Sequence, residues 1–168
     1  MVLKNIFKKY GGRRIALIAA AGLLTLWIVL SILWFAVVHS TYSRFKGSDD
    51  SLDSRGRLTD MLSPNYVYED DGYMIQVFYP KYPSLTSNLV VSTKDDRNSL
   101  FIWPALAGKA RYGVMLYDDR SEADYGFKID VTGKELKAED PLDQERLDSR
   151  ADIVRKLLDE AHKEWGDI

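Results

Sequence analysis

Hydrophobic residues follow three different patterns along the chain. From Ile15 to Val38, 24 residues succeed one another without a charge. From about Tyr66 to Val131, apolar and polar residues alternate with a period of two, and from Leu147 to Trp165 apolar residues recur every three or four positions. These patterns are typical of a membrane-spanning helix, of β-strands with one buried face and of an amphipathic helix, respectively.

The uncharged segment predicts a transmembrane helix over residues 15–38. At a rise of about 1.5 Å per residue it reaches about 36 Å, against roughly 30 Å for the hydrocarbon core of a bilayer. A cleavable signal peptide has a shorter apolar region, of about 7 to 15 residues, and ends in a small-residue cleavage site, whereas here Val38 runs into His39, Ser40 and Thr41. We therefore expect an uncleaved signal anchor. A lipoprotein is excluded because the chain has no cysteine.

Basic residues before this segment predict its orientation. Residues 1–14, the predicted cytoplasmic tail, contain no acid, and their five basic residues are Lys4, Lys8, Lys9, Arg13 and Arg14. Four basic residues follow within about 20 residues of the other end, so the positive-inside bias is only five to four. Translocating the tail against the membrane potential would cost about 2.3 kcal/mol per charge per 100 mV, which favours a cytoplasmic N-terminus. The aromatic residues that mark the predicted outer interface are Trp34, Phe35, Tyr42 and Phe45.

Beyond the membrane segment, the sequence predicts a polar tether and one folded domain. The tether is residues 39–62, and within it eight of the eleven residues from 47 to 57 are Gly, Ser or Asp. Residues 63–168 form the predicted extracytoplasmic domain, which is large enough for one modest core. Residues 39–168 contain 18 Lys and Arg against 25 Asp and Glu, a net charge of −7. This acidic balance argues against nucleic-acid binding.

Six alternating segments predict an antiparallel meander, because only short turn-type connections separate them. The clearest is Tyr125–Val131, in which every second residue is apolar. The others are Tyr66–Tyr68, Tyr73–Tyr79, Leu89–Ser92, Leu100–Trp103 and Tyr112–Tyr117. Asp70-Asp71-Gly72 predicts a tight hairpin between the first two strands.

The last segment predicts one amphipathic helix. Its apolar face consists of Leu147, Ala151, Val154, Leu158, Ala161 and Trp165. Asp140 can cap this helix, Pro141 suits its first turn and Gly166 suits its end. A coiled coil would use a similar stripe, but packing on the sheet is the favoured interpretation. The predicted fold class is α+β: a single N-terminal transmembrane helix, a small antiparallel β-meander sheet and a C-terminal amphipathic helix packed on it.

The sequence lacks the familiar motifs of catalysis and cofactor binding. It contains no phosphate-binding glycine loop, no GxSxG, no HExxH and no Cys/His metal spacing. Of its two histidines, His39 lies at the predicted membrane boundary and His162 lies beside the apolar stripe of the last helix. Since no sequence motif places either histidine with a catalytic nucleophile, we expect no enzymatic activity and no cofactor.

Four Asp-Asp pairs are weak candidates for a metal site. Clustered carboxylates bind Ca²⁺, but Asp also favours turns because its side chain accepts hydrogen bonds from nearby backbone N–H groups. One pair, Asp49-Asp50, lies in the predicted tether, and the other three fall where strands must be joined. None matches an EF-hand loop, so turn formation is the favoured interpretation. The candidate residues of the latter three pairs are Asp70, Asp71, Asp95, Asp96, Asp118 and Asp119.

Aromatic residues concentrate in the predicted sheet and form a candidate binding surface. They are Tyr66, Tyr68, Phe78, Tyr82, Phe101 and Trp103. Alternation places Ile75 and Val77 on one face of the second strand and Gln76 and Phe78 on the other. Since both faces carry apolar residues, one face can serve the core and the other a partner, although burial of both faces is the favoured interpretation.

Within the membrane segment, Trp27 and Trp34 form a candidate partner face. They are seven residues apart and therefore on the same side of the helix, and Trp27 lies far from the interface that Trp prefers. Gly12, Ala16 and Ala20 form a ridge of small residues that would allow close helix approach. Contact with lipid is an equally good interpretation of both features.

These patterns together predict a single-pass protein of the cell membrane. Its extracytoplasmic domain is expected to be a non-catalytic binding or accessory module that acts through protein–protein contacts at the cell envelope. The alternative is an inhibitor or immunity protein, for which a cationic toxin or hydrolase would suit the acidic domain. A membrane-anchored enzyme that uses Asp residues is the third hypothesis. The expected partners are the lipid bilayer and a protein of the membrane or envelope.

Overall fold

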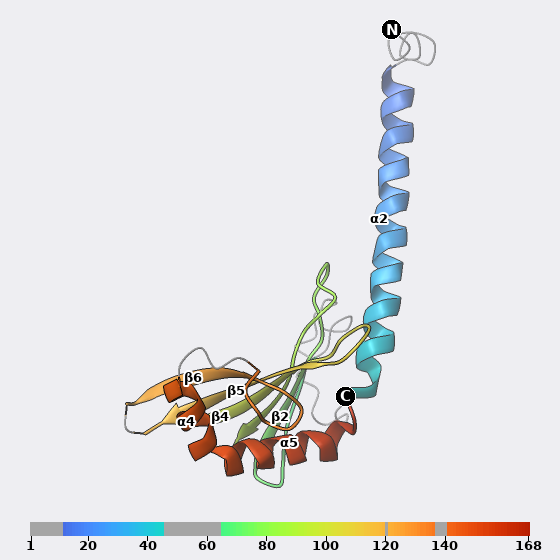
Figure 1. Cartoon of the computed structure of the whole chain (residues 1–168). Helices are drawn as coiled ribbons and strands as arrows, with labels where there is room; N and C mark the ends of the chain where they lie inside the picture. Colours follow the sequence, from blue (N-terminus) through green and yellow to red (C-terminus); the bar gives the residue numbers. More distant parts are fainter. Residues whose placement is uncertain (1–11, 46–64, 120, 137–140) are drawn as a thin grey trace. The chain divides into compact units, whose positions relative to one another are not determined.

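The computed structural model in Figure 1 describes residues 12–45, 65–119, 121–136 and 141–168. The chain forms two compact units, Met1–Val37 and Val38–Ile168. The first contains most of a long helix, and the second contains a six-stranded antiparallel sheet with C-terminal helices. The predicted α+β fold class is therefore confirmed. The predictions for Lys4, Lys8, Lys9, Asp49, Asp50 and Asp140 lie outside the described residues.

Helix α2 extends over Gly12–Tyr42 and, as predicted, is long and apolar enough to cross a membrane. Its large apolar side chains are exposed along most of its length. The two hydroxyl side chains of the apolar segment are bonded to the helix itself: Thr25 Oγ1 donates to the Ala21 carbonyl at 2.9 Å and Ser31 Oγ donates to the Trp27 carbonyl at 2.8 Å. Hydroxyls that are satisfied in this way are compatible with a hydrocarbon environment.

The second unit begins with the last turn of α2 and a 3₁₀ helix, η1, over Ser43–Phe45. Residues 39–45, which the sequence assigns to the tether, are therefore helical. Tyr42 and Phe45 are fully buried, with ring centroids 5.6 Å from Tyr79 and 6.3 Å from Trp165, respectively. Both residues belong to the core of the domain, which the sequence does not indicate, and their predicted place at the membrane interface stays a prediction.

Six strands form one sheet in chain order, with β1 and β6 at its edges. They are β1 (Asn65–Asp70), β2 (Tyr73–Phe78), β3 (Leu89–Thr93), β4 (Asn98–Trp103), β5 (Arg111–Asp118) and β6 (Ala123–Ile129). The β1–β2 hairpin closes with Asp70 paired to Tyr73, and Asp71 and Gly72 have φ values of 45° and 85°. Two consecutive positive φ angles are typical of a two-residue Asp-Gly hairpin turn.

Strand β6 ends at Ile129, two residues earlier than the alternation predicts. The Asp130 carboxylate accepts hydrogen bonds from the backbone N–H groups of Thr132, at 2.8 Å, and Lys134, at 3.1 Å. This side-chain-stabilised turn ends the strand. Val131 is consequently 50% exposed, and its predicted place on the buried face is wrong.

The C-terminal segment forms two helices where the periodicity predicts one. They are α4 (Pro141–Ser149) and α5 (Ala151–Trp165). The Ser149 hydroxyl donates at 2.7 Å to the Arg146 carbonyl, which is the acceptor that the Arg150 N–H would use in a continuous α-helix. The Arg150 N–H donates to the Leu147 carbonyl at 3.1 Å instead. The break leaves Ala151 exposed, so its predicted place on the apolar face is wrong.

Helix α5 packs on one face of the sheet, against β3 and β4 (Figure 1), which confirms the predicted packing. Its buried residues are Val154, Leu157, Leu158, Glu160 and Ala161. The buried strand residues that alternate toward this side include Ile75, Val77, Leu89, Val91, Leu100, Ile102 and Val114. This side of the sheet is the core face, and the opposite side is the open face.

Candidate binding site on the open face of the sheet

The pairing register aligns the side chains of the open face in rows across the strands. The central row contains Val67, Gln76, Val90, Phe101, Gly113 and Lys128. A second row contains Met74, Ser92, Ser99 and Met115. Helices α4 and α5 both lie on the core face (Figure 1), so neither covers these rows.

Phe101 and Trp103 form an aromatic pair on the open face of β4. Their rings stack with centroids 6.1 Å apart and an angle of 18° between the planes. Gly113 of β5 pairs with Phe101, and a Cβ added to it would lie 3.1 Å from Cζ3 and 3.2 Å from Cη2 of the Trp103 indole. The absence of a side chain at Gly113 thus lets the indole approach the backbone of β5. Both rings are half-buried and keep an exposed surface.

A hollow of about 510 Å³ lies beside this aromatic pair. Phe78, Val90, Phe101 and Met115 give its wall an apolar character. Ser92 and Ser99 also line it, and their buried hydroxyls are hydrogen-bonded to each other at 2.9 Å. Asp96 and Asp124, both exposed, supply two carboxylates. Apolar walls with a few polar groups are typical of a site that binds a ligand or a partner's side chain.

The structure divides the six predicted aromatic residues between different surfaces. Phe78, Phe101 and Trp103 are together on the open face. Tyr66 is buried, with its ring 6.1 Å from that of Tyr79. The Tyr68 hydroxyl donates at 2.9 Å to Glu164 of α5, and burial, reinforced by this carboxylate, raises the pKa of Tyr68 well above its ordinary value. Tyr82 is exposed in the β2–β3 loop.

The Asp-Asp pair of the first hairpin joins the sheet to α5. Asp70 and Asp71 both accept hydrogen bonds from Lys163 Nζ, at 2.8 Å and 2.7 Å. Lys163 also donates to Glu160 of its own helix, at 3.0 Å. The hydrogen bond from Lys163 is the main cause that lowers the pKa of Asp71. These two carboxylates therefore have a structural role in holding the hairpin against α5.

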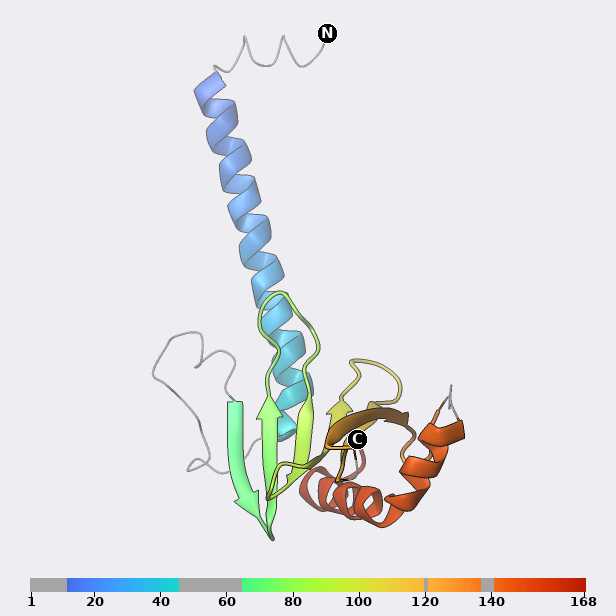
Figure 2. The same ribbon diagram turned by 90° about the vertical axis from the view of Figure 1, so that its left-hand side faces the viewer.

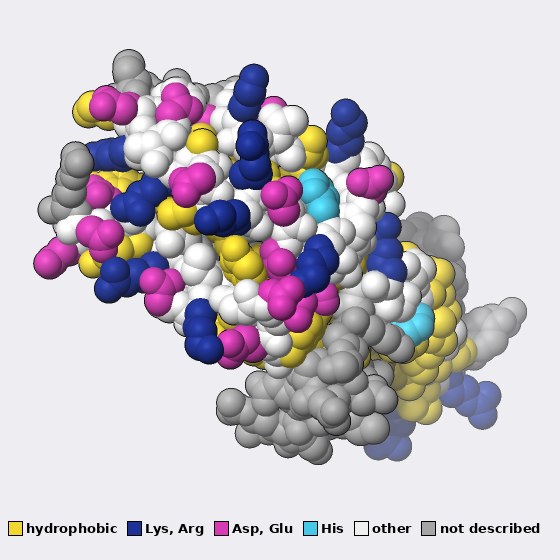
Figure 3. Space-filling view, turned by 90° about the horizontal axis from the view of Figure 1, so that it is seen from below, with side chains coloured by type: hydrophobic (Ala, Val, Ile, Leu, Met, Phe, Trp, Pro, Cys, Tyr) yellow, Lys and Arg dark blue, Asp and Glu magenta, His cyan; other side chains and the backbone are white. Residues whose placement is uncertain are grey.

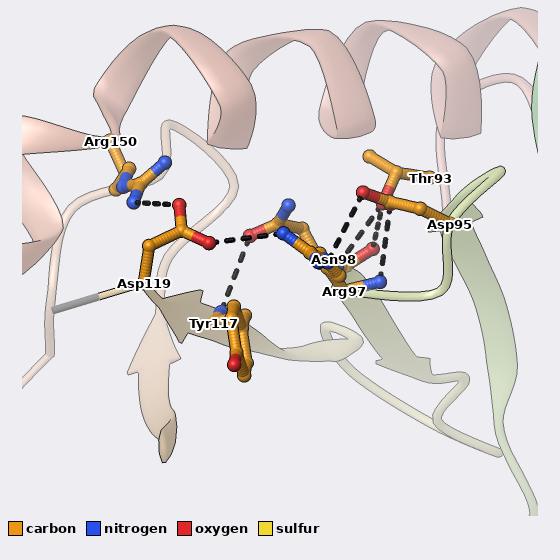
Figure 4. A network of polar contacts seen from close by, with 7 residues as sticks. All are labelled: Thr93, Asp95, Arg97, Asn98, Tyr117, Asp119 and Arg150. Carbon is orange, nitrogen blue, oxygen red and sulfur yellow. Dashed lines mark hydrogen bonds and ion pairs between the residues drawn. The ribbon is translucent and has the colours of Figure 1, made fainter. Parts of the chain in front are cut away.

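The next carboxylates connect two turns with the α4–α5 junction (Figure 4). Asp119 accepts a hydrogen bond from Arg97 at 3.0 Å and lies 3.6 Å from Arg150 Nη2. Asp95 accepts hydrogen bonds from the Thr93 hydroxyl and the Arg97 backbone N–H. The hydroxyl bond is the main cause that lowers the pKa of Asp95. These groups hold the β3–β4 and β5–β6 turns in place.

The two remaining candidate metal ligands, Asp96 and Asp118, have different surroundings. Asp118 accepts a hydrogen bond from the Ser121 hydroxyl at 2.7 Å, and Asp96 lines the open-face hollow. In the part of the chain that the structure describes, no three His, Asp or Glu side chains lie close enough together to hold a metal ion. Neither His39 nor His162 lines the open-face hollow.

A second hollow, also about 510 Å³, lies between β5, β6 and α4. Arg146 extends over the ring of Tyr125, 4.0 Å from its centroid, and pairs with Asp143 at 3.2 Å. Arg150, the other basic residue of this wall, faces Asp119. Because both of its basic groups already have partners, this hollow has less to offer an acidic partner than its composition indicates.

The outer surface of α5 differs from the open face. Seen from the side of α5, acidic and basic side chains intermingle over the domain, and hydrophobic side chains occupy small separate areas (Figure 3). Such a mixed surface is ordinary for a solvated helix. The stacked aromatic pair makes the open face the stronger candidate for binding.

In α2, Trp27 is exposed and Trp34 is half-buried, one heptad further along. Arg13 and Arg14 are exposed in the first turn. The partner face formed by the two tryptophans stays a prediction.

Reasoning from the sequence missed several residues of this site, among them Gly113, Ser92, Ser99, Val90, Met115 and Asp124. Alternation within β4 already indicates that Phe101 and Trp103 share a face, and the same rule applied to β3 would have placed Ser92 with Val90. The role of Gly113 depends on its pairing with Phe101 across the sheet. No signal within β5 identifies that pairing.

Comparison of the chain with protein-family models, with curated proteins and with solved structures gave no match.

Proposed function

We propose that this chain is a single-pass, non-catalytic membrane protein whose extracytoplasmic domain binds a partner protein through the open face of its sheet. Residues 15–38 cross the cell membrane with the basic N-terminal tail in the cytoplasm. The observation that carries the proposal is the stacked pair of Phe101 and Trp103, seated over Gly113 beside an open hollow. Half-buried aromatic residues around an open hollow are typical of the anchoring points of protein interfaces.

The chemistry of the hollow supports binding over catalysis. Its lining contains two ionisable side chains, Asp96 and Asp124, and both are exposed to solvent. A general acid or base needs a perturbed pKa and a reactive neighbour, and the lining includes no His, Lys, Cys or Tyr. Two solvated carboxylates are better suited to attract a basic group.

The same features define the kind of partner. An apolar or aromatic side chain would fill the space between Phe78, Phe101 and Met115. A neighbouring Lys or Arg would face Asp96 or Asp124, in agreement with the acidic balance of the whole domain. We therefore propose a polypeptide segment that combines one large apolar residue with a basic residue.

Photocrosslinking in native membranes tests this function. A crosslinking amino acid at Met115, which is 41% exposed on the open face, is compared with one at Leu142, which is 56% exposed on α4. We expect a discrete adduct at position 115 that is absent at 142, is lost in Trp103→Ala and is weakened when Asp96 and Asp124 are both replaced by Asn. Thermal melting of each variant verifies folding. Equal adducts at both positions, or none at 115, would contradict the proposal.

An inhibitor or immunity protein is a narrower form of the same function, in which the basic partner is an exported toxin or hydrolase. Exposed carboxylates on the binding face favour such a partner. Deletion of the chain should then raise sensitivity to that toxin or enzyme, and Trp103→Ala should reproduce the effect. Unchanged sensitivity after deletion would eliminate this form while leaving the general one intact.

A further inference from the structure

Two loops leave the same end of the sheet and share an unusual composition. They are the β2–β3 loop, residues 79–88, and the β4–β5 loop, residues 104–110. Figure 2 shows the β2–β3 loop, in light green, extending well beyond the ends of its strands. The charged residues of the two loops are Lys81 and Lys109, and neither loop contains an acid. Their exposed large apolar residues are Tyr82 (46%), Leu85 (41%) and Leu106 (44%).

The connections at the opposite end of the sheet differ from these loops in charge and apolarity. They are residues 71–72, 94–97 and 119–122. Together they contain five acidic and three basic residues, a net charge of −2, and no apolar side chain. The two ends of the sheet thus differ in two ways: the acidic residues of the strand connections are all at one end, and the exposed large apolar residues of these connections are at the other.

The apolar, basic end is the one that contacts the end of helix α2. The Tyr42 hydroxyl donates to the Ser87 carbonyl at 3.1 Å and accepts the Ser87 N–H at 2.8 Å. The Tyr79 hydroxyl donates at 2.8 Å to the carbonyl of Tyr42. Both ends of the β2–β3 loop are therefore fixed to the last residue of α2.

The distance from this contact to the membrane segment is short. Tyr42 follows Val38 by four residues, or about 6 Å of helix. The headgroup layer on each side of a bilayer is about 5 to 8 Å deep. A hydrocarbon core that ended at Val38 would therefore leave Tyr42, and the Ser87 backbone that it bonds, within about the depth of the headgroup layer, and Leu85 is only two residues from Ser87.

The β2–β3 loop also has internal structure that presents its side chains. The Ser84 N–H donates to the Lys81 carbonyl at 2.8 Å, and the Ser84 hydroxyl donates to the Thr86 carbonyl at 2.8 Å. The Thr86 N–H returns a bond to the Ser84 hydroxyl at 3.3 Å. These bonds satisfy polar backbone groups within the loop itself. Residues 81–86 are all exposed, and their side chains therefore project outward.

The described acidic residues at this end of the sheet lie in other segments. Asp130 and Glu135 follow β6, and Asp167 follows α5. The Asp130 carboxylate is occupied by Thr132 and Lys134 of its own turn. The two loops therefore present cations and apolar groups without an acid of their own.

We propose that the β2–β3 and β4–β5 loops dock on the outer surface of the same membrane that α2 crosses. Tyr82, Leu85 and Leu106 enter the interfacial layer, and Lys81 and Lys109 contact lipid phosphates. Tyr is favoured at this depth, and Lys can bury its stem while its charge stays with the headgroups. The inference rests on the proposed membrane anchoring but not on the proposed partner of the open face.

Single-cysteine labelling of the full chain tests the docking, because the chain has no native cysteine. The variants are Leu85→Cys, Leu106→Cys and, as a matched control on α4, Leu142→Cys, each carrying an environment-sensitive fluorophore in liposomes of phosphatidylcholine and phosphatidylglycerol. We expect labels at 85 and 106 to be quenched by spin-labelled lipid and protected from iodide, and the label at 142 to show the reverse. Equal behaviour at all three positions would overturn the docking.

A second measurement isolates the role of the lysines. In the Lys81→Gln/Lys109→Gln variant, the ratio of docked to undocked chains should fall about fivefold per lysine in anionic liposomes, because one basic residue near such a surface contributes about 1 kcal/mol. The fall should be smaller in pure phosphatidylcholine, whose headgroups contain a phosphate but have no net charge. An unchanged ratio in anionic liposomes would refute the phosphate contact. Flotation of the liposomes separates the two proposals: a chain that does not float refutes the anchor itself, whereas a floating chain with iodide-accessible labels refutes only the docking.

Discussion

Replacing Tyr42 by Phe should destabilise the domain although it changes a residue of helix α2. The phenol is fully buried, and its hydroxyl makes two hydrogen bonds to the backbone of Ser87. Phe keeps the ring contacts with Tyr79, at 5.6 Å, and Phe45, at 6.1 Å, so the loss is confined to the hydroxyl. Each bond contributes about 1 kcal/mol net. Because Ser87 is half-buried, water can satisfy part of its freed backbone, and we expect a loss of about 2 kcal/mol.

Thermal unfolding of the full chain in detergent micelles measures this loss. Tryptophan fluorescence is the suitable signal, because α2 would remain helical in detergent and mask the change in far-ultraviolet circular dichroism. For a domain of this size, 2 kcal/mol corresponds to a drop in Tm of roughly 6–10 °C. Tyr73→Phe is the matched control, since the Tyr73 hydroxyl has no hydrogen-bond partner among the described residues. A Tyr42→Phe variant that melts together with the wild type would refute the reasoning.

Three further predictions concern the core, the alkaline limit and the binding face. Leu157→Ala should cost about 2–5 kcal/mol in urea unfolding, because Leu157 is fully buried in α5; Leu157→Met, which keeps the volume, should cost less than about 1.5 kcal/mol. Burial raises the pKa of Tyr79 to about 12, above the ordinary value of 10.0, so the folded state retains this proton longer and stability should fall as the pH rises from 10 to 12. Melting curves over this range, with Tyr79→Phe as the reference, should show that the reference loses less stability. Gly113→Ala should displace the Trp103 indole, shift its emission and reduce crosslinking at Met115; unchanged emission and crosslinking would show that the indole does not need this space.

The features that the sequence predicts well are those with a local period. The six strands follow from alternation, because a half-buried sheet repeats every two residues whatever its partner. Helix α5 follows from a stripe repeated every three or four residues. The first hairpin follows from the preference of Asp-Gly for positive φ, which Asp71 and Gly72 adopt. Each of these signals is contained within a few neighbouring residues.

The features that the sequence misses depend on non-local or competing contacts. Aromatic residues just beyond a membrane segment suit the interface, so Tyr42 and Phe45 give no local indication that they enter the core. The break between α4 and α5 depends on which donor takes the Arg146 carbonyl, and the Ser149 hydroxyl takes it. The space under Trp103 depends on the pairing of β4 with Gly113 of β5. None of these outcomes can be derived from the periodicity of one segment.

The burial of Tyr42 and Phe45 shortens the connection between residues 15–38 and the folded domain. A flexible tether over residues 39–62 would have a root-mean-square length of about 25–30 Å, and the domain could explore a volume of that radius. With Tyr42 in the core, the path from Val38 to the domain is about 6 Å of helix. If residues 15–38 cross a membrane, as proposed, this short connection keeps the domain close to the bilayer. A partner that is itself a membrane or surface-bound protein meets the open face at a high effective concentration there, whereas a freely diffusing partner gains nothing from the anchor. The short connection therefore favours a membrane-associated partner for the open face.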